Sequence, residues 1–264
     1  MDEETRRAKL AEIARKKVVF RLPEMDAVAV RRDIAYRTTA DGSLLMDIYS
    51  PPDAGARAPV VVIVLGYPDP QSGIRMYGPI TSWARLIAAS GMTAVIYGSS
   101  APVDDIHAVL SYLRENAGSL DIDEQRIGLF GMSANVAVAL AALMRDDTLK
   151  CAVLLCGYTF DVEGSTAFAD ASREYGYVNA TAGRSIKELP AGVPLFVVRA
   201  GLEQFPGVNA ALDQFAANAL ALNLPLTFVN HATGLHGFEF DEDSVVSRGI
   251  IQQVLAFLRL HVGA

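Results

Sequence analysis

The sequence contains no apolar run long enough to span a membrane, because none reaches the roughly 18 apolar residues that a transmembrane helix requires. Its first residues, 1–17, are charged throughout and lack the apolar segment of a secretory signal peptide. These two absences predict a soluble cytoplasmic protein that has no membrane partner.

Cysteine is also scarce. The sequence has only two, Cys151 and Cys156, which fall within one apolar run at an odd spacing. If that run is a strand, the two side chains point to opposite faces of the sheet and cannot form a disulfide. The sequence therefore predicts neither a disulfide nor a redox or metal-binding pair of cysteines.

An excess of basic residues is missing as well, because 23 Lys and Arg stand against 30 Asp and Glu, for a formal net charge of -7. Proteins that bind nucleic acid normally present a basic surface to the phosphates. The charge balance therefore argues against a nucleic-acid partner and favours a small neutral substrate.

Hydrophobic residues make up 51% of the 264-residue chain, and they recur in segments that alternate between strand and helix patterns. Residues 30–38 and 44–51 flank the turn signal Ala40-Asp41-Gly42-Ser43 and predict a β-hairpin. Continuous apolar runs, most of them ending at glycine, predict strands buried on both faces of a parallel sheet, at 58–66, 92–98, 126–131, 151–157, 194–201 and 225–233. Helices are predicted at 80–90, 103–116, 133–146, 209–222 and 244–260. The alternation predicts an α/β protein with a mostly parallel, eight-stranded, doubly wound sheet and helices on both faces.

No repeat, linker or low-complexity stretch divides residues 30–264, so we expect them to form a single domain after an N-terminal extension, 1–29. Leu10 and Ile13 lie at helical spacing and predict an amphipathic helix in this extension, which caps the core or meets a second subunit of a homodimer. A solvated tail is the alternative. The long irregular stretch 158–192 is predicted to be a short lid-like insertion, because irregular segments of that length are usually functional or disordered.

A serine stands where one predicted strand turns into a helix, in Gly131-Met132-Ser133-Ala134-Asn135. Ligands bind beyond the carboxyl ends of the strands in such sheets, and a tight turn there needs small neighbours, which Gly131 and Ala134 supply. The helix N-terminus would stabilise developing negative charge. The stretch therefore predicts a nucleophile elbow, although Asn135 stands where G-x-S-x-G has its second glycine. The alternative role for Ser133 is an N-cap of the helix.

A serine nucleophile needs a base, and the sequence has 4 histidines. His107 lies within a predicted amphipathic helix and His261 near the C-terminus, so both are interpreted as surface or packing residues. His231 lies within the last strand pattern, where a structural role is expected. His236 follows that strand in a glycine-rich loop, 234–238, and is the predicted base.

The acid that orients the base is predicted to follow the preceding strand, where Glu203 lies. The resulting order, Ser133, Glu203, His236, is the chain order of the triad in this architecture. Other carboxylates remain as alternatives, each with a surface role as its simplest explanation: Asp161, Glu239, Asp241, Glu242 and Asp243.

Backbone donors for an oxyanion are expected from two places. The N–H of Ala134 follows the nucleophile, and the loop after the first buried strand supplies a second donor. In that loop Pro68 has no N–H, which leaves Tyr67, while Gly66 allows the backbone to approach closely. The alternative is a proline-rich turn without a catalytic role.

Over residues 30–262 the chain resembles an α/β-hydrolase of the dienelactone-hydrolase-like esterase group. The resemblance rests on the stretches "DIYSPPD", "VLGYPDP", "GMSAN", "RAGLEQFPGVN" and "GLHGF". It implies that Ser133 is the nucleophile, Glu203 the acid and His236 the base. That group often has aspartate in place of Glu203, and dienelactone hydrolases proper have cysteine in place of Ser133, so a simple ester is a better expectation than a dienelactone.

These observations predict a serine carboxylic-ester hydrolase that forms a covalent acyl-enzyme and uses no cofactor or metal. The residues expected to shape the pocket for a small-molecule ester are Gly66, Met132, Phe160, Tyr175 and Tyr177. A thioesterase, lactonase or peptidase on the same scaffold would share the triad. A non-catalytic binding protein of the same fold is the other alternative, which Asn135 and Glu203 alone suggest.

Overall fold

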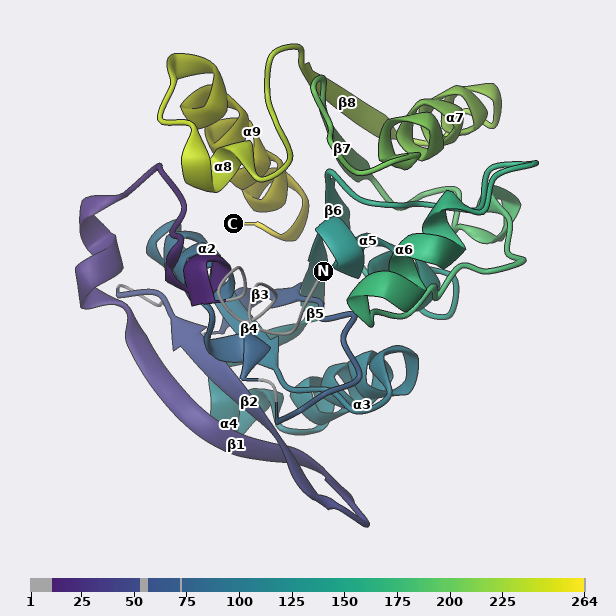
Figure 1. Ribbon diagram of the computed structural model, residues 1–264. Coiled ribbons are helices and arrows are strands. Elements are labelled where there is room, and N and C mark those ends of the chain that lie inside the picture. The colour runs from purple at the N-terminus through teal and green to yellow at the C-terminus, as the bar shows by residue number, and fades with distance from the viewer. Residues whose placement is uncertain (1–10, 53–56, 72, 264) are drawn as a thin grey trace.

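The computed structural model describes residues 11–52, 57–71 and 73–263 (Figure 1). Its centre is an eight-stranded sheet in the order β1-β2-β4-β3-β5-β6-β7-β8. The strands are β1 (Ala29–Thr39), β2 (Gly42–Ser50), β3 (Ala58–Ile63), β4 (Thr93–Tyr97), β5 (Ile122–Met132), β6 (Ala152–Leu155), β7 (Leu195–Ala200) and β8 (Leu226–His231). β1 pairs with β2 and β2 with β4 in antiparallel fashion, and the other neighbours are parallel. The predicted hairpin and the six apolar strands are therefore all present, but β8 is not buried on both faces as expected, because it lies at the edge of the sheet.

Burial explains why these strands were visible in the sequence. Every residue of β3, β4 and β6 is buried, as expected for strands that are covered on both faces. β5 begins earlier than predicted, at Ile122, because Ile122 still pairs with Ala58 of β3 across a register shift. The polar residues between Ile122 and Ile127 hid this first part of the strand.

Helices cover both faces of the sheet, with α2 and α9 on one side and α3, α5 and α7 on the other (Figure 1). These five correspond to the predicted helices and span α2 (Gly78–Ala89), α3 (Pro102–Glu115), α5 (Val136–Leu143), α7 (Val208–Ala221) and α9 (Val245–Val262). Shorter helices that were not predicted are α4 (Ala117–Leu120), α6 (Ala167–Tyr175) and α8 (Phe238–Asp241). Single turns of 3-10 helix are η1 (Pro23–Ala27), η2 (Ile74–Met76), η3 (Ser133–Asn135) and η4 (Ile186–Glu188). The stretch 158–192 is thus less irregular than expected, because it contains α6 and η4.

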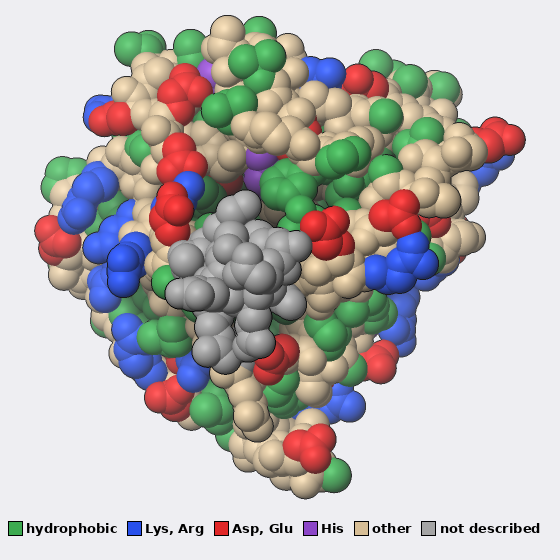
Figure 2. Space-filling model, viewed as in Figure 1, with side chains coloured by type: hydrophobic (Ala, Val, Ile, Leu, Met, Phe, Trp, Pro, Cys, Tyr) green, Lys and Arg blue, Asp and Glu red, His purple; other side chains and the backbone are tan. Residues whose placement is uncertain are grey.

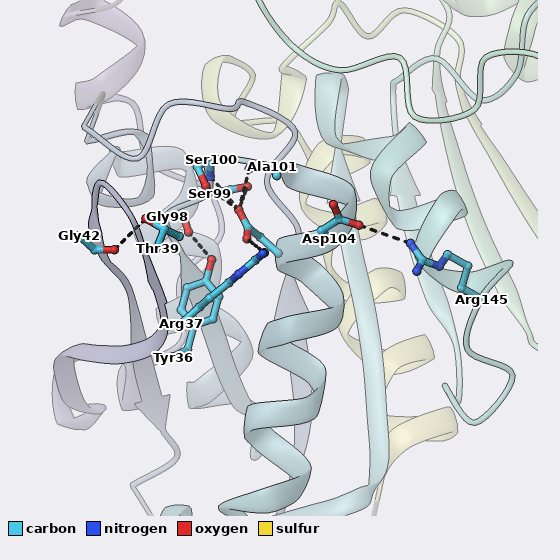
Figure 3. Close-up of polar contacts among 11 residues, drawn as sticks. Tyr36, Arg37, Thr39, Gly42, Gly98, Ser99, Ser100, Ala101, Asp104 and Arg145 are labelled. Atoms are coloured by element: carbon cyan, nitrogen blue, oxygen red, sulfur yellow. Dashed lines mark hydrogen bonds and ion pairs between the residues drawn. The ribbon is translucent and has the colours of Figure 1, made fainter.

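The antiparallel hairpin is tied to α3 by a buried carboxylate, Asp105. Figure 3 shows three of its partners, Arg37, Ser100 and Ala101. Asp105 has no exposed surface and pairs with Arg37 of β1. Its Oδ2 also accepts hydrogen bonds from the backbone N–H groups of Ser100 and Ala101, at 2.7 Å each. These bonds fix the turn between β4 and α3 at the edge of the sheet where the strands end.

The N-terminal extension contacts the rest of the chain where the structure describes it. Residues 11–15 are helical, with Ile13 44% exposed, and Leu10 lies outside the described residues. The Val18 N–H donates to Ser82 Oγ of α2 at 3.0 Å, and the Val19 N–H donates to the Glu239 carbonyl of α8 at 2.9 Å. Residues 18–19 therefore contact α2 and α8 through their backbone, whereas Ile13 in the helical turn before them is exposed.

Two expectations from composition can be compared with the described residues. Cys151 and Cys156 are both buried free thiols. In the ranges that the structure covers, no helix has both the length and the apolar character needed to cross a bilayer. On the face drawn in Figure 2, acidic and basic side chains are mixed.

Candidate active site

Ser133 occupies a sharp turn between β5 and α5. β5 ends at Met132, and Ser133 has a φ of 52°, in the left-handed region that residues other than glycine rarely adopt. Such strain is typical of the strand-to-helix turn that presents a nucleophilic serine. The conformation is that of the predicted elbow.

Two glycines allow the backbone to pack around this turn. A Cβ on Gly131 would lie 3.1 Å from Ala139 Cβ and 3.2 Å from Val136 Cα. A Cβ on Gly157, which follows β6, would lie only 2.1 Å from the Ser133 carbonyl oxygen. The role of Gly157 was missed in the sequence, where its position at the end of an apolar run was the only signal.

The structure brings Ser133, His236 and Glu203 into one hydrogen-bonded chain. Ser133 Oγ lies 2.8 Å from His236 Nε2, and His236 Nδ1 lies 2.7 Å from Glu203 Oε2. Both distances are those of strong hydrogen bonds. The three residues follow β5, β8 and β7, parallel strands whose carboxyl ends meet at the same edge of the sheet.

The hydrogen-bond partners of His236 define its tautomer. A carboxylate can only accept a hydrogen bond, so in the tautomer that bonds Glu203 the proton lies on Nδ1 and the Nε2 lone pair faces the hydroxyl of Ser133. Glu203 is held for this role, because its side chain is 1% exposed and its Oε1 accepts from the Phe205 N–H at 2.9 Å. The arrangement lets His236 accept a proton from Ser133.

Backbone and side-chain bonds join the loops that carry the acid and the histidine. The Gly201 N–H donates to the His231 carbonyl at 2.8 Å, and the Leu202 N–H donates to the Gly234 carbonyl at 2.9 Å. Gln204 Oε1 accepts from the His236 N–H at 3.0 Å. Gln204 was missed in the sequence, because nothing in its type or spacing indicates a contact with a loop so distant along the chain.

The other histidines lie elsewhere. His231 is 1% exposed, its Nε2 lies 3.1 Å from Ser247 Oγ, and its ring packs edge-on against Phe238. His107 is half-buried on α3, and its burial lowers its pKa. His261 packs on Phe257 of α9, and burial lowers its pKa too. None of these three is hydrogen-bonded to Ser133.

The alternative carboxylates are not hydrogen-bonded to His236, whose Nδ1 pairs with Glu203. Asp161 accepts from Asn179 Nδ2 at 3.0 Å and from the Gly183 N–H at 3.3 Å, so it braces the stretch 158–192. Glu239 is 3% exposed, and burial raises the pKa of its carboxyl. The remaining three lie next to cationic or imidazole groups: Asp241 beside Lys16, Asp243 beside Arg248 and Glu242 beside His231.

The loop after β3 lies directly against the elbow. A Cβ on Gly66 would approach the Ala134 carbonyl oxygen to 2.8 Å, so the backbones of the two segments are in close contact. The Gly66 N–H donates to Asn135 Oδ1 at 2.7 Å. The structure thus places Tyr67 and Ala134, the two predicted oxyanion donors, on adjoining backbone segments.

The predicted pocket residues divide into two groups. Tyr175 is 37% exposed and packs edge-on against Phe205, whose ring contacts that of His236 at 4.7 Å between centroids. Tyr177 packs edge-on against Tyr67. By contrast Met132 is buried at the end of β5, and Phe160 stacks on Phe215 of α7. Phe205 therefore contacts the triad through His236, Tyr175 packs on Phe205, and Tyr177 packs on Tyr67 in the loop after β3.

Comparisons with known proteins agree with this architecture. A protein-family model described as alpha/beta hydrolase fold matches residues 97–206. A bacterial heroin esterase superposes with a TM-score of 0.72 at 16% identity, over 99% of this chain and 91% of the esterase. A thermostable esterase from Pseudomonas putida ECU1011 has a TM-score of 0.76 at 14% identity, over 100% of this chain and 91% of its own. The esterase Est2 from Thermogutta terrifontis has a TM-score of 0.64 at 20% identity, over 90% and 94%. No curated protein matches the sequence, and the structural likenesses confirm the predicted fold class.

Proposed function

We propose that this chain, which has the α/β-hydrolase fold, is a serine hydrolase that cleaves carboxylic esters. The proposal rests on one observation, the continuous hydrogen-bonded chain from Ser133 through His236 to the buried carboxylate of Glu203. A serine hydroxyl is a weak nucleophile on its own and becomes a strong one when an oriented imidazole can take its proton.

In the first half of the reaction, Ser133 Oγ attacks the ester carbonyl carbon while His236 Nε2 accepts its proton. The negative charge that develops on the carbonyl oxygen is stabilised by the N–H groups of Tyr67 and Ala134. When the tetrahedral intermediate collapses, His236 donates its proton to the leaving alkoxide oxygen. The alcohol departs, and the acyl group remains on Ser133.

In the second half, His236 accepts a proton from a water molecule, whose oxygen attacks the acyl carbon. The second tetrahedral intermediate uses the same oxyanion donors and collapses to a carboxylic acid, and His236 returns the proton to Ser133 Oγ. Glu203 stays ionised throughout and stabilises the imidazolium in both halves. No step requires a cofactor or a metal ion.

The surroundings of the triad favour a small ester with an apolar group. The rings of Tyr175 and Phe205 pack against each other, and Phe205 packs against His236, so aromatic surface borders the reacting atoms. We take the stretch 158–192, which carries Tyr175, as a lid over the catalytic domain, 30–264. The superposed structures are named as esterases, which supports ester cleavage over cleavage of a thioester, lactone or peptide. We place this activity in the cytoplasm as part of the same proposal.

A fluorophosphonate probe tests the proposal, because it reacts only with an activated serine. We expect one probe per chain, attached to Ser133 and detected by intact mass and peptide mapping. A panel of esters, thioesters, lactones and peptides of matched acyl groups then identifies the preferred bond. A protein that stays unlabelled under conditions that label a known serine esterase would be a binding protein, and the proposal would be wrong.

Replacement of the proposed acid gives a graded test. Glu203→Gln keeps the shape of the side chain but removes its charge, so it should lower kcat by roughly 10² to 10⁴ through loss of tautomer control. Glu203→Asp should retain more activity than the amide, because the charge survives on a shorter side chain. Asp161→Asn is the matched control and should leave kcat within about threefold of the wild type, measured by ester hydrolysis per active site. The opposite ranking of Glu203→Gln and Asp161→Asn would assign the acid to Asp161.

A further inference from the structure

We infer that Asn135 is a positioning residue that holds the oxyanion loop, residues 64–67, in its catalytic geometry. The inference rests on the proposed function and extends it to a residue that is neither the nucleophile nor a donor to the oxyanion. In the sequence, Asn135 was only a departure from the G-x-S-x-G pattern. Its side-chain contact explains why an asparagine stands there.

The contact is a buried hydrogen bond between the two segments. Asn135 is 5% exposed, and its Oδ1 accepts from the Gly66 N–H at 2.7 Å. The amide orientation follows from chemistry, because a backbone N–H can only donate and so requires the oxygen of the side chain rather than its NH₂ group. A buried N–H without an acceptor would be costly, so this bond constrains where the loop can lie.

Other contacts fix the loop on its remaining sides. The Leu65 N–H donates to Tyr97 Oη at 3.3 Å, and the Gly66 carbonyl accepts from the Val178 N–H at 2.9 Å. A Cβ on Gly66 would lie 3.3 Å from Asn135 Oδ1, which shows how closely the loop backbone lies against this side chain. The bond to Asn135 ties the loop to the elbow itself.

The position of Asn135 in the turn explains how this bond can affect catalysis. Ser133, Ala134 and Asn135 form the single turn η3. The proposed nucleophile, one oxyanion donor and the side chain that holds the oxyanion loop therefore belong to one rigid turn. The bond also occupies the Gly66 N–H, which is therefore not available to the oxyanion. Donors must lie about 2.7–3.1 Å from the oxyanion, so a small displacement of the loop weakens the stabilisation.

Hydrogen exchange measures the bond without reference to activity. In the wild type the Gly66 amide should be protected, and in Asn135→Ala its protection factor, measured by NMR, should fall at least about tenfold relative to that of Val62 in β3. Asn135→Asp retains an acceptor oxygen at the same reach and should restore the protection. Equal protection of Gly66 in the wild type and in Asn135→Ala would overturn the inference.

Kinetics then show whether the bond serves the oxyanion. Complete loss of one oxyanion donor costs about 10²–10³ in kcat, so a loosened donor should cost about 10- to 100-fold, with KM changed less than about threefold, because the donors act mainly in the transition state. A trifluoromethyl ketone, which forms an oxyanion adduct on the serine, should lose affinity by the same factor as kcat/KM. Asn135→Asp should stay impaired in turnover, because its carboxylate opposes the negative oxyanion.

Asn116→Ala is the matched control, because Asn116 Nδ2 donates to the Tyr112 carbonyl at the end of α3. It should leave both kcat and ketone affinity unchanged. All rates are divided by the fraction of sites that fluorophosphonate titrates, which removes any loss due to misfolding. An Asn135→Ala enzyme with wild-type kcat and ketone affinity would overturn this inference alone. A wild-type protein that neither hydrolyses esters nor reacts with either inhibitor would overturn the proposed function and this inference with it.

Discussion

Ser133→Ala is expected to abolish ester turnover and probe labelling, with kcat lower by about 10⁴-fold or more, because no other group in the triad can carry the acyl intermediate. The fold should survive the change. Alanine meets the same backbone strain as serine at a φ of 52°, and the lost Ser133 Oγ contact is to His236, whose side chain is 16% exposed. Water can take the place of the hydroxyl there, so the melting temperature should shift by only a few degrees, on the order expected for less than about 1 kcal/mol.

The comparison uses purified wild-type and variant protein at equal folded concentration, checked by circular dichroism. Ser119→Ala is the matched control, because Ser119 Oγ is exposed and donates only to the Asn116 carbonyl next to α4. It should keep full activity and full labelling. Hydrolysis by Ser133→Ala at more than about a hundredth of the wild-type rate would place the nucleophile elsewhere.

The inner parallel strands could be predicted from the sequence because they are buried on both faces. Strands such as β3 and β6 contain only buried residues, so they read as continuous apolar runs. The sequence did not predict the polar start of one strand or the very short helices. Polar and charged residues follow Ile122 at the start of β5, and α4 and α8 span four residues each, too few to show a helical period.

Residues of the candidate site could be predicted where they directly follow a strand of the parallel sheet. Ser133, Glu203 and His236 each follow a parallel strand, and the sheet necessarily brings those ends together. Asn135 and Gln204 could not be assigned in the same way, because each bonds a backbone N–H of a loop far away in the sequence. Contacts of that kind depend on the exact approach of two loops, which composition and periodicity do not encode.

The two histidines that follow the last strand pattern should respond differently to replacement by alanine. His236→Ala removes the group that takes the proton of Ser133, so kcat should fall by about 10⁴-fold or more, as for the serine variant. Its stability should change little, because the ring lies partly exposed at the edge of the sheet. Active-site titration with fluorophosphonate should slow by a similar factor, because the probe also needs an activated hydroxyl.

His231→Ala should chiefly lower stability. His231 is 1% exposed, its ring packs against Phe238, and the backbone of Gly234 lies so close that a Cβ there would be 2.6 Å from the ring. Removing this side chain leaves a cavity and takes one hydrogen-bond partner from Ser247 Oγ, which still accepts from Ser244 Oγ, so urea unfolding should show a loss of about 2–4 kcal/mol. Turnover per folded molecule should stay within about tenfold of the wild type, because His236 and its bonds to Ser133 and Glu203 remain. If His231→Ala were the inactive variant and His236→Ala the active one, the base would be His231, and the hydrogen-bonded chain through His236 would have no catalytic meaning.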